Sequence, residues 1–344
     1  MSFQISDCTI RDGGYLTGKV FPDEFIRGVI GGLVDAGIDY VEIGFLQKQI
    51  NGEPIVYSDS KGVKKYLPSE KKNTEFVGFC DNSRYSIDLL DECDHQTFES
   101  LRISFAKHES AEALKFCAAA KQKGYRVFVQ PMDAPGYTFE ERAKMIEEVN
   151  KMQPETFSIV DTFGIMDMHE LREIFQQVDS LLDKNIKVGL HSHNNLNLSC
   201  ALVEDLISMA EKTDRSVVVD GALFGMGRGA GNANTEAIVH LLNKRYGKKY
   251  DLPLLLDIIE KYIVPLKSKV RWGYDLPMFV CGSQCSHVDN VYYIERTKSA
   301  SVRDMYEVIG SLSVDKRKRY GSGYSKNDFS LLQESLDSYY KSKK

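Results

Sequence analysis

Eight short strand-like segments, most of them followed by a longer helical pattern, constrain the fold of this chain more than any other feature. Helical patterns occupy 22–37, 138–152, 168–182 and 197–212, and several open with the Pro, Ser, Thr or Asp typical of helix starts. A strand followed by a helix, repeated eight times, predicts an α/β fold of the closed (β/α)₈ barrel type. The strand candidates, rich in β-branched and aromatic residues, are 3–9, 39–45, 75–80, 100–105, 125–132, 156–161, 187–193 and 216–222.

The alternative architecture is an open, doubly wound sheet. Such a sheet usually has fewer repeats, and no G-x-G-x-x-G follows the first strand candidate. A barrel takes roughly 250 residues, and the chain has 344, which leaves room for an appendage. From about Leu252 the alternation stops and helical runs follow. We therefore expect a catalytic barrel over 1–250 and a helical C-terminal region over 251–344.

Composition limits the classes of partner and the compartment. The net charge is −5, so a nucleic-acid or membrane-surface partner, which needs a basic face, is not expected. Seven cysteines without a framework spacing are read as reduced thiols. No apolar run approaches the roughly 20 residues that span a bilayer, and the N-terminus lacks the features of a signal peptide. These observations predict a cytoplasmic protein.

Two histidines at the end of the seventh strand candidate give the sharpest functional signal. Residues i and i+2 of a strand point to the same side, so His191 and His193 can reach one ion. Asp12 is expected at the end of the first strand, between Thr9 and Gly14, and supplies a carboxylate at the same end of the barrel, where such folds carry their active sites. This mixed donor set suits a divalent ion. Mn²⁺ or Mg²⁺ is favoured by carboxylate and water, and Zn²⁺ or Co²⁺ also fits.

Arg11, beside Asp12, is the second feature. It could form a surface ion pair, but a guanidinium next to a metal would stabilise an oxyanion or enolate, the charge that carbon–carbon cleavage creates. Gly13 and Gly14 are expected to let the backbone turn sharply there. The glycine-rich loop at 225–232 either cradles an anion or makes a tight turn. The run from Cys281 to His287 has metal-like spacing but lacks a second ligand pair.

Three motifs together resemble the DRE-TIM metallolyase superfamily. Asp7 to Gly13 is similar to its D-x-T-x-R-D-G signature, and His191 to Asn195 to its H-x-H-N-(N/D) signature. The stretch from Asp220-Gly221 to Glu236 is similar to its D-G-…-G-N-x-x-x-E pattern. The three motifs keep their order over roughly residues 4–245. Chain length and a helical C-terminal end look closest to the 4-hydroxy-2-oxovalerate aldolase branch; the superfamily also includes hydroxymethylglutaryl-CoA lyase, isopropylmalate synthase and homocitrate synthase.

The resemblance implies roles at single positions. The metal ligands of the family are matched by Asp12, His191, His193 and Asn232. Arg11 matches the residue that stabilises the enolate. Thr162 matches a hydroxyl residue that contacts the substrate carboxylate, and Glu42 matches an acid near the site. Two positions depart from the aldolase branch. Its catalytic His, three residues after the metal-binding Asp, is replaced by Tyr15, and its C-terminal Tyr has no match around Cys281. Tyr15 is therefore the expected proton-transfer residue.

We expect a divalent-metal-dependent aldolase that cleaves or forms a 4-hydroxy-2-keto acid through a pyruvate enolate held by the ion and Arg11. Its partners would be a small 2-keto acid and an aldehyde. The resemblance leaves room for a homodimer and for a partner enzyme at the C-terminal region. The alternative is an acyl-CoA-dependent, Claisen-type synthase on the same metal site. A non-catalytic barrel subunit is less favoured, because Arg11, Asp12, His191 and His193 are all present.

Overall fold

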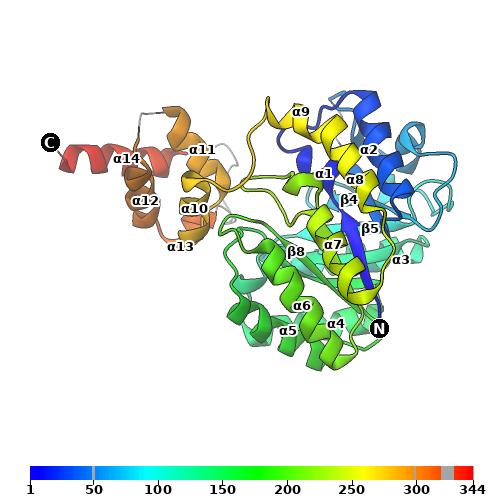
Figure 1. Ribbon diagram of the computed structural model, residues 1–344. Helices are drawn as coiled ribbons and strands as arrows, with labels where there is room; N and C mark the ends of the chain where they lie inside the picture. The colour runs from blue at the N-terminus through cyan, green and yellow to red at the C-terminus, as the bar shows by residue number, and fades with distance from the viewer. Residues whose placement is uncertain (49–50, 298–299, 319–328, 344) are drawn as a thin grey trace.

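The computed structural model describes residues 1–48, 51–297, 300–318 and 329–343 (Figure 1). Eight parallel strands form a closed barrel, because β1 pairs with both β9 and β2. The closure confirms the predicted (β/α)₈ fold and excludes the open sheet. The barrel strands are β1 (Phe3–Asp7), β2 (Tyr40–Leu46), β4 (Glu75–Asp81), β5 (Ser100–Phe105), β6 (Arg126–Pro131), β7 (Thr156–Asp161), β8 (Lys187–Ser192) and β9 (Val217–Gly221).

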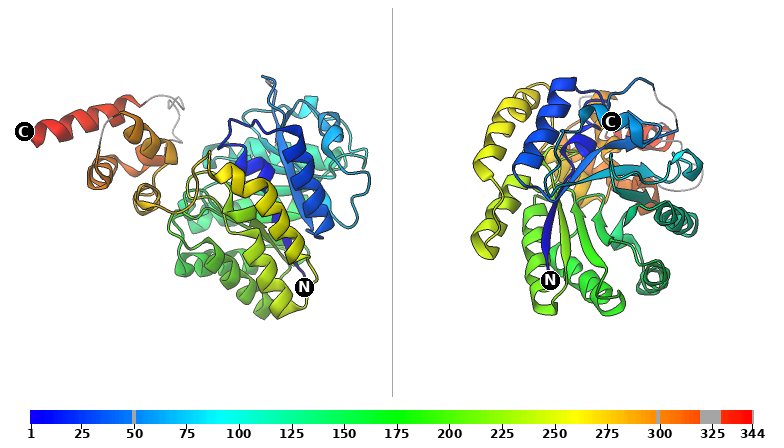
Figure 2. Two further views of the ribbon diagram at one scale, coloured as in Figure 1. Left: turned by 45° about the horizontal axis from the view of Figure 1, so that its top comes forward. Right: turned by 90° about the vertical axis from the view of Figure 1, so that its right-hand side faces the viewer.

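Helices surround the barrel on the outside (Figure 2). The expected helix is reduced to a short 3-10 turn at two of the eight connections, η1 (Ser60–Tyr66) after β2 and η2 (Ile87–Leu89) after β4. The segments there are rich in Ser, Lys, Asp and Pro and carry no long apolar stripe for a helix to bury. The full helices are α2 (Asp23–Asp35), α3 (Ser110–Gln122), α4 (Phe139–Met152), α5 (Met168–Leu181), α6 (Ser199–Thr213) and α7 (Thr235–Tyr246); β3 (Val56–Tyr57) extends the sheet beside β2.

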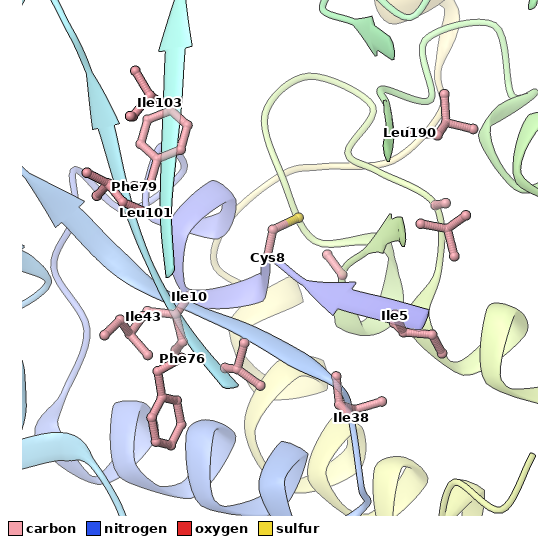
Figure 3. Close-up of a cluster of buried hydrophobic side chains, with 14 of the residues drawn as sticks. Ile5, Cys8, Ile10, Ile38, Ile43, Phe76, Phe79, Leu101, Ile103 and Leu190 are labelled. Carbon is pink, nitrogen blue, oxygen red and sulfur yellow. The ribbon is translucent and has the colours of Figure 1, made fainter. Parts of the chain in front are cut away.

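The main hydrophobic core lies between the barrel wall and these helices. Helix α2 shows how the sequence builds it, since Ile26, Val29, Ile30 and Leu33 recur at helical spacing and are fully buried. Figure 3 shows the facing wall, where Ile5, Ile43 and Phe76 come from three different strands. The strands are buried on both faces, which explains why they read as nearly continuous apolar runs.

The helical C-terminal region divides into two parts. Helix α8 (Leu252–Ile258), with η6 (Ile259–Ile263) and α9 (Val264–Lys267), packs on the barrel beside α2, and the barrel core continues as far as Trp272. A second core joins α10 (Leu276–Ser283), α11 (Val288–Thr297), α12 (Val302–Ser311) and α14 (Ser330–Ser342). These helices and α13 (Val314–Lys318) lie to one side of the barrel in Figure 1. We therefore propose a division near residue 273 rather than at 250. The second group is α10–α14, hereafter the C-terminal unit.

No helix in the described part of the chain combines the length and the apolar character needed to cross a membrane.

Candidate active site

Inward-facing side chains form layers inside the barrel. One buried layer contains Tyr40, Val77, Phe128 and Val218. Side chains of a strand alternate between its two faces, and two residues further along β2, β6 and β9 the inward positions are polar, whereas β4 has Phe79 there. The polar layer contains Glu42, Arg102, Gln130 and Asp220, all buried, and the pocket opens above it at the carboxyl ends of the strands.

The predicted metal ligands come together. One donor atom each from Asp12, His191 and His193 can be chosen so that all three lie within 4.8 Å of one another. His191 lies in β8, and His193 follows directly after that strand. Asp12 does not lie on an extended strand end as expected, because β1 ends at Asp7 and the short helix α1 (Thr9–Gly13) carries the carboxylate. This is the one cluster of potential metal-binding side chains in the described ranges.

Each imidazole is oriented by a second contact. His191 Nδ1 lies 2.9 Å from Asp220 Oδ2, and His193 Nδ1 lies 3.2 Å from the carbonyl oxygen of Gly231. When Nδ1 donates to an oxygen, Nε2 is left without a proton and can bind an ion. The two rings are perpendicular, with centroids 5.1 Å apart. The arrangement therefore presents two ring nitrogens from one strand end, as a metal site requires.

The charge states of these ligands fit a divalent cation. Burial alone would raise the pKa of Asp12, but Arg11 and the two histidines outweigh it and lower the pKa to about 2. Burial, only partly opposed by Asp12, lowers the pKa of His193 to about 4. At neutral pH the site therefore holds a carboxylate and a neutral imidazole, the forms that bind metals.

Asn232 provides an independent test of whether these residues fit a metal ion. Its Nδ2 donates to Asp12 Oδ2 at 2.5 Å and to the Met226 carbonyl oxygen at 3.2 Å. Its Oδ1 is buried and has no hydrogen-bond partner within the described residues. A buried amide oxygen without a partner is costly and is explained by an ion or water that would occupy the site. The residues present thus fit a divalent metal.

Glycines bring the chain close to this centre. Gly227 packs against Asn232 and Asp12 so tightly that a Cβ there would overlap both side chains. The next backbone N–H, of Arg228, points at Asp12 Oδ2 from 3.4 Å. Gly14 follows α1 with an ordinary helical φ of −57°, so the expected sharp turn does not explain it. Gly13 and Gly14 instead make room for neighbouring side chains, since added Cβ atoms would meet Met226 and Ile55.

Arg11 is a buried cation at the floor of the pocket. Its Nε donates to Glu42 Oε2 at 2.5 Å, its Nη1 donates to Asp12 Oδ1 at 2.7 Å, and its guanidinium lies 4.6 Å from the centre of the Phe79 ring. Burial opposes the charge, but Glu42 and Asp12 raise the pKa of Arg11 far above its usual value. Its Nη2 is buried without a partner in the described structure. A surface ion pair, the alternative drawn from the sequence, does not describe this residue.

Glu42 lies beneath the site rather than in it. The side chain is fully buried and does not line the pocket. It contacts Arg11 on one side, and on the other side its Oε1 lies 2.7 Å from Arg102 Nη1. Arg102 also donates from Nη2 to Asp220 Oδ1 at 2.9 Å and pairs through Nη1 with the other oxygen. Arg102 therefore joins the carboxylate that holds Arg11 to the carboxylate that holds His191.

The pocket contains about 660 Å³ of space not filled by protein atoms, part of it open to solvent. Tyr15 lies at its wall, 40% exposed, with its ring edge-to-face against Phe45 and 5.7 Å from the Arg228 guanidinium. Burial of the hydroxyl raises the pKa of Tyr15. Thr162 also lines the pocket, and its hydroxyl oxygen accepts the backbone N–H of Asp133 at 2.9 Å.

Several lining residues escaped the sequence analysis. Gln130, in β6, has a buried side-chain oxygen without a partner in the described ranges. A polar residue within an otherwise apolar strand of a parallel barrel was the available signal for both Gln130 and Arg102. His287 had no such signal, because it comes from the C-terminal unit rather than from a strand end. The Cys281 thiol donates to the Ser286 carbonyl oxygen at 2.9 Å and shares no metal cluster with Cys285 or His287 in the described structure.

The C-terminal unit contacts the barrel at the mouth of the pocket. Arg228, in the loop after β9, donates to Asp289 Oδ1 at 2.9 Å and lies 3.0 Å from His287 Nε2. Lys318 of α13 pairs with Asp133, after β6, at 2.7 Å. Ser286, His287 and Val288 line the pocket as well, so its wall is shared between the barrel and the C-terminal unit.

Comparisons with known proteins agree with the fold. The sequence model of the HMGL-like family matches residues 86–260. A 4-hydroxy-2-oxovalerate aldolase from Bacillus thuringiensis is 27% identical over 76% of both chains. A protein of the same name from Moorella thermoacetica is 25% identical over 90% of this chain and 91% of its own. The solved N-terminal domain of a candidate aldolase from Bacteroides vulgatus superposes with a TM-score of 0.70 at 24% identity, covering 86% of this chain and 97% of that domain.

Proposed function

The chain belongs to the HMGL-like family, and from that premise we propose that it is a divalent-metal-dependent aldolase. The reaction is the cleavage of a 4-hydroxy-2-keto acid to pyruvate and an aldehyde, or its reverse. The observation that carries the proposal is the unpartnered, buried Nη2 of Arg11 beside a cluster of three potential metal ligands. A fixed cation with a spare donor suits a reaction that develops negative charge on an oxygen next to the ion.

The residues divide into ligands and substrate contacts. Asp12, His191 and His193 would hold the ion, with Asn232 as an amide ligand, and we favour Mn²⁺ or Mg²⁺ because oxygen donors and water complete the set. When bound, the ion supplies Lewis-acid polarisation of a 2-keto acid.

Arg11 stabilises the enolate oxygen that forms when the C3–C4 bond breaks. Glu42 does not touch the pocket, so we assign it the positioning of Arg11 rather than a proton-transfer step. We assign Thr162 to the substrate carboxylate, because it lines the pocket and its hydroxyl can donate while its oxygen accepts the Asp133 N–H.

The synthase alternative uses the same platform. Acetyl-CoA condensation with a 2-keto acid would release a free thiol, whereas the aldolase reaction would not. The two relatives described above are both named as 4-hydroxy-2-oxovalerate aldolases and align over most of their length, which favours the aldolase. A non-catalytic barrel is disfavoured by the complete donor set.

The test needs no knowledge of the aldehyde. Purified protein with Mn²⁺ and pyruvate in D₂O should exchange the methyl protons of pyruvate, measured as loss of the methyl signal by proton NMR. The variant His191→Ala/His193→Ala should lose both the bound ion and the exchange, and His169→Ala, an 80% exposed residue of α5, serves as the matched control. If the metal-loaded protein shows no exchange and instead releases free thiol from acetyl-CoA, the aldolase proposal is wrong and the synthase function takes its place.

A further inference from the structure

The proposed reaction requires a group that accepts and returns a proton inside the pocket. We propose that His287, contributed by the C-terminal unit, is this acid–base residue. The inference rests on the proposed aldolase function and adds to it a catalytic residue from outside the barrel.

Elimination among the histidines supports the choice. All seven histidines lie in the described structure. His191 and His193 belong to the metal cluster. Only His287 of the remaining five lines the pocket, whereas the others are exposed on the outside of the barrel: His95, His108, His169 and His240. Among the described residues, His287 is thus the one imidazole of the pocket that does not belong to the metal cluster.

The other titratable groups of the pocket suit the step less well. Asp12 is a potential ligand, and Arg11 and Arg228 are cations that cannot accept a proton. Tyr15, the residue expected from the sequence, carries a phenol, a group whose ordinary pKa is near 10. Very little of it would be the phenolate base at neutral pH. An imidazole changes its charge near pH 7 and can act in both directions of proton transfer.

His287 is held in place at the pocket wall. Its side chain is 12% exposed, and its backbone N–H donates to the Arg317 carbonyl oxygen at 2.9 Å. The backbone N–H of Asp289 donates to its Nδ1 at 3.3 Å, and the Asp289 carboxylate lies 3.4 Å from the same nitrogen. Arg228 Nη2 lies 3.0 Å from Nε2 and 3.4 Å from Nδ1, and the same nitrogen donates to Asp289 Oδ1 at 2.9 Å.

Arg228 links this ring to the rest of the site. Its guanidinium lies over the Tyr15 ring, and its backbone N–H points at Asp12. His287 therefore lies one side chain away from the residues around the potential ion, at the opening through which an aldehyde would enter. A proton carrier for the hydroxyl of the aldehyde half belongs on that side.

The proton balance is simple. In cleavage, a ring nitrogen of His287 takes the proton of the C4 hydroxyl, the C3–C4 electron pair stays with C3 as the pyruvate enolate, and the aldehyde leaves. The imidazolium then returns the proton to C3, giving pyruvate and restoring the neutral ring. Reversal of the second step in D₂O exchanges the methyl protons of pyruvate, so the exchange assay reads the proposed role directly.

The experiment compares His287→Gln, His287→Ala and the surface control His169→Gln in the full chain loaded with Mn²⁺. We expect His287→Gln to slow methyl exchange by about 10² or more while Mn²⁺ affinity, measured by calorimetry, stays within about twofold. Added imidazole should partly restore exchange in His287→Ala and leave the unmodified protein and His169→Gln unchanged. A merely structural role for the ring would not give this rescue.

The outcomes separate the two proposals. Exchange by the unmodified protein that persists at the same rate in His287→Gln would overturn the assignment and leave the aldolase function standing. Loss of exchange in Tyr15→Phe, with His287→Gln fully active, would transfer the role to Tyr15. Absence of both exchange and cleavage in the unmodified, metal-loaded protein would remove the aldolase function, and the role of His287 with it.

Discussion

Asp220 Oδ2 lies 2.9 Å from Nδ1 of His191, and the same carboxylate is paired with the guanidinium of Arg102. Burial opposes ionisation of Asp220, but Arg102 and His191 outweigh it and lower the pKa of this carboxyl. An ionised Asp220 accepts a hydrogen bond from Nδ1–H of His191. This leaves Nε2 of His191 unprotonated and directed towards the potential ion. One interior salt bridge thereby sets the tautomer of a metal ligand.

Asp220→Asn should weaken metal binding without removing a ligand. The amide cannot fix the tautomer of His191 as a carboxylate does, and loss of such an outer contact costs roughly 10- to 100-fold in affinity. Calorimetric titration with Mn²⁺ measures the change. Asp214→Asn, at a side chain that is 85% exposed directly after α6, should bind Mn²⁺ normally. Equal affinity in all three proteins would contradict the orienting role.

Arg102→Met should destabilise the fold strongly. It would leave Glu42 and Asp220, both buried, without their common cation, and breaking a buried pair in this way costs about 3–5 kcal/mol. The matched control is Arg172→Met, which breaks a pair with Asp205 at the surface, where Arg172 is 56% exposed, and should lower the stability far less. Urea unfolding of the metal-free proteins gives both values, and similar losses would refute the special role of Arg102.

Arg11→Ala should lower the aldolase rate by about 10²–10³ while the bound ion is retained. The reason is that the unpartnered Nη2 is the donor assigned to the enolate, and removing one oxyanion donor has an effect of this size. Cleavage rates and metal content are measured on the same sample. Arg11→Lys keeps the charge but not the planar set of donors, and it should recover only part of the rate. Full activity in Arg11→Ala would disprove the enolate role.

Gly227→Ala should impair metal binding although it adds one methyl group. The new Cβ would overlap Asn232 and Asp12, so the glycine loop must withdraw from the centre. Gly31→Ala is the control, because that position in α2 has open space around it and helix interiors favour Ala over Gly by roughly 0.5–1 kcal/mol. The expected pattern is weaker Mn²⁺ binding in the first variant and unchanged binding in the second.

The stability of the metal-free protein should fall on mild acidification. The pKa of His193 is lowered from 6.5 to about 4, chiefly by burial. Between these values the unfolded chain binds more protons at this site than the folded chain, so stability rises with pH across the window and is lost as the pH falls through it. One proton gives a slope of at most about 1.4 kcal/mol per pH unit.

Urea unfolding of the metal-free protein across this range measures that slope. His193→Gln removes the titrating group and should flatten the curve between pH 6.5 and about 4. An unchanged slope in the variant would assign the effect to other residues.

The barrel was predictable because the sequence pattern of each strand and helix is local and recurs along the chain. Apolar strand segments recur eight times, and each carries enough β-branched and aromatic residues to be recognised alone. The sequence also predicted two groups at one end of the barrel, since each group lies within a single segment. These groups are the motif around Arg11 and Asp12 and the pair His191 and His193. The sequence did not reveal that α1, rather than a strand end, carries Asp12, because five residues are too few for a helical period.

Only the tertiary structure decided which charges meet. Arg102 and Asp220 are 118 residues apart in the chain, and no local pattern indicates that ring closure brings β5 and β9 to opposite sides of one small interior where their side chains pair. The position of His287 likewise depends on how the C-terminal unit packs on the loop after β9. Local sequence determined the strands, the helices and the donors at strand ends, whereas long-range closure and packing determined which donors are oriented, which are neutralised and which face the pocket. The physical reason is that burial makes each interior charge depend on partners that the chain contributes from distant segments.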